Sequence, residues 1–121
     1  MPKIMLAEDD MTMLYLLKTL LRMEGYETIA LNEQEDVLVA VHREQPDVIL
    51  LDVHLTQGNG VDFLRAIRSD RNLDKMVVIM QSGMNLMDEC RVAGADTFLL
   101  KPYMPEVLID AIRDGLTGRK L

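Results

Sequence analysis

An unbroken apolar run that ends in a carboxylate occupies Asp47-Val48-Ile49-Leu50-Leu51-Asp52. Consecutive apolar residues, β-branched at Val48 and Ile49, are typical of a strand that is buried on both faces of a parallel sheet. Asp52 would then stand at the carboxyl end of this strand, the edge of an open α/β sheet where ligands bind. From this run alone, a site residue and an ordinary capping or loop residue are equally good interpretations of Asp52.

Length and composition indicate one ordinary domain. The chain has 121 residues, 49% of them hydrophobic, which is enough to build a packed core. Its formal charge of -7 argues against direct contact with nucleic acid, which relies on clustered Lys and Arg. Neither a signal segment nor a long apolar run is present, and the single cysteine, Cys90, cannot form an internal disulfide. We therefore expect a soluble, cytoplasmic domain over residues 1–121 that binds neither nucleic acid nor membranes directly.

Short apolar runs alternate with amphipathic segments along the whole chain. The predicted strands are residues 4–7, 26–30, 47–52, 76–80 and 98–100. The predicted helices are residues 11–24, 32–44, about 61–67, 86–92 and 105–116. Asn32 and Glu35 resemble a capping box that opens the second of these helices. Five β-α units in this order predict a parallel sheet with helices on both faces and right-handed crossovers.

Polar residues stand at the ends of four predicted strands: Glu8-Asp9-Asp10, Asp52, Gln81-Ser82-Gly83 and Lys101-Pro102. Parallel strands bring these ends to one edge of the sheet, where several carboxylates repel each other unless a cation compensates. Mg²⁺ would do so, because it binds one or two carboxylates together with water and a phosphate. This arrangement predicts Asp9 and Asp52 as direct ligands, whereas Asp10 would only begin the following helix.

The same edge carries the groups that a phosphoryl group requires. The Ser82 hydroxyl and the Lys101 ammonium suit its oxygens. Asp52 would be the nucleophile, since an aspartate carboxylate can attack phosphorus and form an acyl phosphate.

In their order and placement these residues resemble the receiver domains of two-component response regulators, the single-domain chemotaxis regulator included. The resemblance covers nearly the whole chain. It rests on Glu8-Asp9, Asp52, Ser82 before a small residue, Gly94-Ala95-Asp96 and Lys101-Pro102-Tyr103. It implies a doubly wound (βα)5 sandwich of three layers, flavodoxin-like, with strand order 2-1-3-4-5. It also implies a phosphoryl-accepting signalling domain rather than an enzyme.

The resemblance further implies how phosphorylation proceeds. Asp52 would take the phosphoryl group from a histidine kinase or a histidine phosphotransfer protein in a Mg²⁺-dependent reaction. Asp9 and Asp52 would bind the metal directly, Glu8 through water, and His54 through its backbone carbonyl. The His54 side chain would lie at the rim of the site and affect the lifetime of the phosphoryl group.

A switch is implied in the same way. Ser82 and Lys101 would hold the phosphoryl oxygens, and Phe98 would swing inward as Ser82 moves toward the phosphate. This movement would remodel the surface of the fourth helix, fifth strand and fifth helix for a downstream protein target or a missing output domain. The bond between Lys101 and Pro102 would be cis.

Two features depart from the family pattern. Thr56 stands where a proline is usual, which predicts a less rigid loop after Asp52. The span from Ser82 to Lys101 is shorter than usual by about one helical turn, so we expect a truncated or displaced fourth helix.

Three alternatives stay open. A flavodoxin-like FMN-binding module would share the strand pattern, but Glu8-Asp9-Asp10 would repel its phosphate. A phosphatase with an aspartyl nucleophile would need a second Asp where this chain has His54. The chain would equally suit a receiver fragment of a larger regulator, with residues 117–121 as a tail or the start of a linker.

Overall fold

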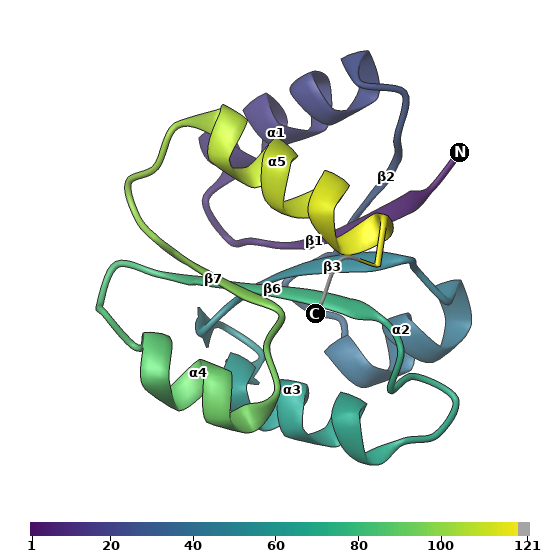
Figure 1. Cartoon of the computed structure of the whole chain (residues 1–121), viewed down its shortest axis with the longest axis vertical. Helices are drawn as coiled ribbons and strands as arrows, with labels where there is room; N and C mark the ends of the chain where they lie inside the picture. Colours follow the sequence, from purple (N-terminus) through teal and green to yellow (C-terminus); the bar gives the residue numbers. More distant parts are fainter. Residues whose placement is uncertain (119–121) are drawn as a thin grey trace.

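The predicted sheet and its strand order are confirmed by a computed structural model, which describes residues 1–118 (Figure 1). Five parallel strands lie in the order β2-β1-β3-β6-β7: β1 (Lys3–Ala7), β2 (Glu27–Ala30), β3 (Val48–Asp52), β6 (Val77–Ser82) and β7 (Thr97–Leu100). Because β6 and β7 are the fourth and fifth strands of this sheet, the order is the expected 2-1-3-4-5. Residues 119–121 lie outside the described part, so their prediction as a tail or linker stays a prediction.

Helices cover both faces of the sheet and make three layers (Figure 1). One face carries α1 (Met11–Met23) and α5 (Pro105–Leu116); the other carries α2 (Val37–Glu44), α3 (Gly60–Ser69) and α4 (Met87–Ala93). With 7 residues, α4 is the shortest of these helices, as the short span between Ser82 and Lys101 requires. Within the described residues, no helix is long and apolar enough to cross a membrane.

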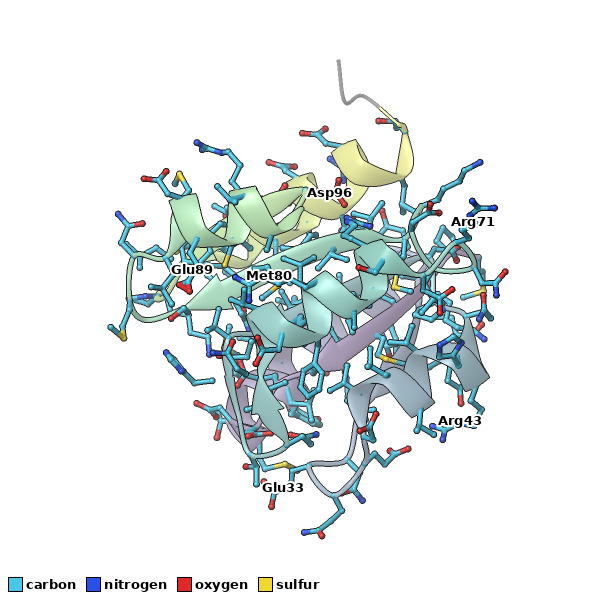
Figure 2. All side chains as sticks on the ribbon, turned by 90° about the horizontal axis from the view of Figure 1, so that it is seen from below. Glu33, Arg43, Arg71, Met80, Glu89 and Asp96 are labelled. Carbon is cyan, nitrogen blue, oxygen red and sulfur yellow. The ribbon has the colours of Figure 1, made fainter. Side chains whose placement is uncertain are left out.

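Successive residues of the central strands face opposite layers. On β3, Val48 and Leu50 pack with α1 and α5, whereas Ile49 and Leu51 pack with the opposite helices. Burying a strand on both faces requires apolar residues at every position, which explains the unbroken run. Met80 lies at the centre of the molecule in Figure 2 and is fully buried, while labelled charged side chains such as Glu33 and Arg43 project from the periphery.

Asp10 caps α1, as predicted. Its Oδ1 accepts hydrogen bonds from the backbone N–H groups of Thr12 (3.0 Å) and Met13 (3.2 Å). These donors have no partner within the helix, so the cap satisfies them and turns the chain away from the sheet edge. Asp10 is thereby separated in role from Glu8 and Asp9.

The predicted start of the second helix is wrong. The Asn32 backbone N–H does donate to Glu35 Oε1 (3.2 Å), but this contact belongs to a turn that precedes the helix. The helix α2 begins at Val37 and is capped by Asp36, whose Oδ1 accepts from the Val39 N–H (3.0 Å). Two acceptor side chains of similar capping ability lie close together here, and burial of Val37 against the sheet selects the later one.

After β3 the chain forms a small hairpin that the sequence did not predict. Its two strands, β4 (His54–Leu55) and β5 (Gly58–Asn59), pair antiparallel and lead directly into α3. A Cβ atom on Gly60 would lie 2.3 Å from the carbonyl oxygen of Asp52. Only glycine therefore allows α3 to begin so close to the end of β3. This close approach fixes the path of the loop that follows Asp52.

Arg68 fastens α3 to the segment that leads into β7. Its guanidinium pairs with Asp96 Oδ2 (2.8 Å), which also accepts the Val78 N–H (2.8 Å). It also donates at 2.6 to 3.0 Å to three carbonyl oxygens, those of Gly94, Asp74 and Met76. This network gives the Gly94-Ala95-Asp96 motif a structural role at the opposite edge of the sheet from Asp52.

The Arg68 network predicts a difference between two neighbouring arginines of α3. Arg68→Lys keeps the positive charge but loses the planar fork, so the free energy of unfolding should fall by about 2 kcal/mol. Arg65→Lys is the matched control, because the Arg65 side chain is 58% exposed and its ion pair is with Asp62, which is exposed as well; we expect a change within about 0.5 kcal/mol. Urea unfolding measures both, and equal losses would contradict the role assigned to Arg68.

Candidate functional site

Side chains from the ends of β1, β3 and β7 meet at the carboxyl edge of the sheet. The loops after β1, β6 and β7 lie at this edge, on the left of Figure 1. Glu8 directly follows β1, and Asp52 closes the adjacent β3. The Lys101 Nζ, at the end of β7, lies 2.9 Å from Glu8 Oε1 and pairs with Asp52 Oδ2. The structure therefore brings together three of the residues predicted to share one site.

The Lys101 ammonium is held in its charged form by this position. Burial by itself lowers the pKa of Lys101, but hydrogen bonds and charge attraction from Asp52 and Glu8 outweigh it and raise the pKa above its ordinary value. Glu8 and Asp52 are only 5% and 6% exposed. Two buried carboxylates thus share one ammonium, which compensates only part of their formal charge.

The Asp52 carboxylate is held at both oxygens. Its Oδ1 accepts the backbone N–H of His54 (3.1 Å), and its Oδ2 accepts the Lys101 ammonium. The His54 side chain is exposed, so it lies at the rim as predicted. The bond between Lys101 and Pro102 is cis, in agreement with the resemblance.

Asp9, the remaining acid of the predicted set, is half-buried and contacts the loop after β3. Its Oδ2 accepts both the backbone N–H and the hydroxyl of Thr56, each at 2.8 Å. A proline at this position has neither donor. Thr56, which stands where a proline is usual, therefore anchors this loop to the segment after β1. The prediction of a less rigid loop stays a prediction.

Ser82 and Phe98 lie on the face of the sheet that α2, α3 and α4 cover. Ser82 is buried, and its Oγ accepts the Met84 N–H (3.0 Å) in the loop to α4. Phe98 pairs in register with Met80 on the neighbouring strand and is half-buried against the same core cluster. Beside it lies a cavity of about 270 Å³ that Met87 also lines.

A buried polar chain behind Glu8 was missed from the sequence. Gln81 is fully buried; its Nε2 donates to Glu8 Oε1 (2.7 Å), and its Oε1 accepts the Tyr103 hydroxyl. Burial, followed by the charges of Glu8 and Asp52, raises the pKa of Tyr103, so its hydroxyl stays a donor. The available signal was a glutamine directly after the apolar residues 77–80, since a polar side chain in a buried strand needs a partner.

The oxygen donors at this edge fit a hard divalent cation. Together, Glu8, Asp9 and Asp52 carry three formal negative charges against the single positive charge of Lys101. Within residues 1–118, no three His, Cys, Asp or Glu side chains are grouped as a metal cage. Mg²⁺ needs no such cage, because it commonly takes one or two carboxylates and keeps several waters. Asp9 and Asp52 therefore suit it by chemistry.

Comparison with known proteins gives consistent results. The family model "Response regulator receiver domain" matches residues 4–113. DNA-binding response regulator MtrA of Mycobacterium tuberculosis H37Rv is 30% identical over 116 residues, covering 94% of this chain and 50% of the relative. Transcriptional regulatory protein CpxR of Escherichia coli K12 is 34% identical over 114 residues, covering 93% and 48%. The chain thus spans about half the length of these curated relatives.

Solved structures agree. A CheY-like response regulator receiver domain protein from Methanospirillum hungatei JF-1 superposes with a TM-score of 0.86 at 28% identity, covering 98% of this chain and 95% of the other. The family match, the strand order and the polar residues at the strand ends lead to one assignment. The chain belongs to the response regulator receiver domain family, the signalling module of two-component systems.

Proposed function

We propose that Asp52 accepts a phosphoryl group from a histidine kinase or a histidine phosphotransfer protein. The observation that carries this proposal is the Lys101 ammonium, which is shared by Asp52 and Glu8 at the edge of the sheet. A two-component receiver implies a histidine kinase as partner. The FMN-binding alternative rested on the strand pattern, which the family match explains equally well. The acids after β1 would also repel the FMN phosphate.

The proposed step converts a phosphohistidine into an acyl phosphate. A carboxylate oxygen of Asp52 attacks the phosphorus, an O–P bond forms, and the N–P bond breaks with its electron pair left on the imidazole, which takes up a proton. Lys101 would transfer its contact from the Asp52 carboxylate to a phosphoryl oxygen and neutralise charge there. The His54 N–H bond at Oδ1 helps to orient the nucleophile before attack.

Mg²⁺ would be held by Asp9 and Asp52 directly, by Glu8 through water and by the His54 backbone carbonyl. The ion supplies positive charge to the phosphoryl oxygens when it is bound. Receiver domains are typically Mg²⁺-dependent, and the excess of carboxylates over ammonium groups at this edge supports the same dependence here.

The signal would leave the site through Ser82. When its hydroxyl turns toward a phosphoryl oxygen, the bond between Ser82 Oγ and the Met84 N–H is lost, which frees the loop into α4. Phe98 would then move inward on the same side of the sheet. The surface that changes, formed by α4, β7 and α5, carries exposed apolar side chains: Met84, Met87, Leu100, Met104 and Val107. Such side chains suit an adaptable protein contact.

The recipient of the signal is a downstream protein target or an output domain of a longer regulator. The second arrangement is favoured by the curated relatives, which are about twice as long as this chain and include a DNA-binding response regulator. We propose that residues 1–121 form the receiver of such a system. Its net charge of -7 supports leaving any contact with nucleic acid to another domain.

Phosphorylation of Asp52 is tested by intact-mass measurement after incubation with a small acyl or amido phosphate and Mg²⁺. The wild-type protein should gain the mass of one phosphoryl group and lose it after removal of the donor. Asp52→Asn should gain none, because its amide oxygen is a poor nucleophile. Asp10→Asn is the control, since Asp10 caps α1, and it should still be modified. If Asp52→Asn still gains the phosphoryl mass, Asp52 is not the residue that accepts the phosphoryl group.

Metal binding is tested by thermal unfolding with and without Mg²⁺. A ligand that binds only the folded state stabilises by RT ln(1 + [L]/Kd), about 2.7 kcal/mol when [L] is a hundred times Kd. The melting temperature of the wild-type protein should therefore rise with Mg²⁺ concentration. Asp9→Asn should show a much smaller rise, whereas Asp10→Asn should behave as the wild type. If millimolar-scale Mg²⁺ leaves the melting temperature of the wild-type protein unchanged, the result would contradict Asp9 and Asp52 as metal ligands.

A further inference from the structure

Thr56 holds the carboxylate of Asp9 from a segment 47 residues away in the chain. Its backbone N–H and its hydroxyl both donate to Asp9 Oδ2, each at 2.8 Å. Among the hydrogen bonds between described residues, none is donated to Oδ1. One oxygen of Asp9 is thus committed to the protein, and the other stays available to a ligand.

The position of Thr56 in the loop gives these bonds a second effect. Thr56 and Gln57 form the two-residue turn of the β4–β5 hairpin. Gln57 Nε2 donates to the carbonyl oxygen of Asn32 (3.0 Å), so both turn residues are anchored to other segments. The hairpin begins at His54, two residues beyond Asp52. Its tip therefore ties the segment after β1 to the segment after β3.

We propose that Thr56 is a positioning residue of the metal site. It orients Asp9 with one oxygen free and restrains the hairpin that carries the His54 carbonyl, so the donors from two loops are arranged before the ion arrives. This inference rests on the proposed function, because it takes Asp9 as a Mg²⁺ ligand.

The expected size of the effect follows from the behaviour of other metal sites. Hydrogen-bond partners of ligating groups fix their orientation, and their loss typically lowers metal affinity by about 10- to 100-fold. Thr56 is exposed and keeps its backbone N–H in most variants, so the lower end of this range applies to loss of the hydroxyl alone. If the hydroxyl instead competed with the ion for Oδ2, it would weaken Mg²⁺ binding, and its removal would tighten that binding.

Three variants of the full chain separate these relations. Thr56→Val removes the hydroxyl at nearly constant shape, and the Mg²⁺ Kd should rise about tenfold. Thr56→Ser retains the hydroxyl and should stay within about twofold of the wild type. Thr19→Val is the matched control, because the Thr19 hydroxyl donates to the Tyr15 carbonyl oxygen (3.0 Å) within α1; its Kd should not change.

The measurement is isothermal titration with MgCl₂, accompanied by melting temperatures without the ion to show that each variant is folded. A Thr56→Val protein that is folded and binds Mg²⁺ as tightly as the wild type, or more tightly, would overturn the role of Thr56 while leaving the metal site intact. If titration of the wild-type protein with MgCl₂ shows no binding, the proposed metal site is overturned, and the role of Thr56 with it. The two failures are therefore distinguishable.

Discussion

Repulsion between neighbouring carboxylates is the constraint on which this edge of the sheet depends. Glu8 and Asp52 are almost fully buried, and a buried charge is costly unless it is paired. Lys101 reaches both of them, and their attraction keeps its ammonium charged despite burial. With Asp9 next to Glu8 in the chain, the formal negative charge of the three acids exceeds the positive charge of Lys101. The proposed Mg²⁺ and phosphoryl chemistry both begin from this imbalance.

The parallel sheet is what makes the carboxylates neighbours. With β1 and β3 adjacent and parallel, their carboxyl ends lie at the same edge, and β6 and β7 continue that edge as far as Lys101. Because helices cover both faces of β3, the sheet edge is where a ligand would reach Asp52. Gly60 keeps α3 close against this end of the strand. Burial of the apolar core and the geometry of the charged site are thus consequences of one topology.

Each acid also has its own set of restraining donors. Glu8 accepts Gln81, which is itself bonded by Tyr103; Asp9 accepts Thr56; Asp52 accepts the His54 N–H. Buried polar groups such as Glu8 and Gln81 specify one arrangement when all members are satisfied. The α4, β7 and α5 surface differs, because it presents exposed apolar side chains such as Met87, Leu100 and Val107. A rigid acid site next to an adaptable surface is consistent with the proposed signalling role.

Local pattern was sufficient for the five strands of the parallel sheet and for the polar residues at their ends, but not for the β4–β5 hairpin or the start of α2. Three patterns predicted the observed sheet: the apolar run before Asp52, the helical spacing in α1 and α5, and the acids after β1. The first two are recognisable in the sequence because the spacing of apolar residues reflects which side of an element is buried. Asn32 and Asp36 are both competent caps, so the start of α2 was decided by the burial of Val37. The bonds from Thr56 to Asp9 and from Tyr103 through Gln81 to Glu8 join residues far apart in the chain. Such contacts exist only after the strands have assembled, because a hydrogen bond depends on distance and direction in space and leaves no periodic trace in the sequence.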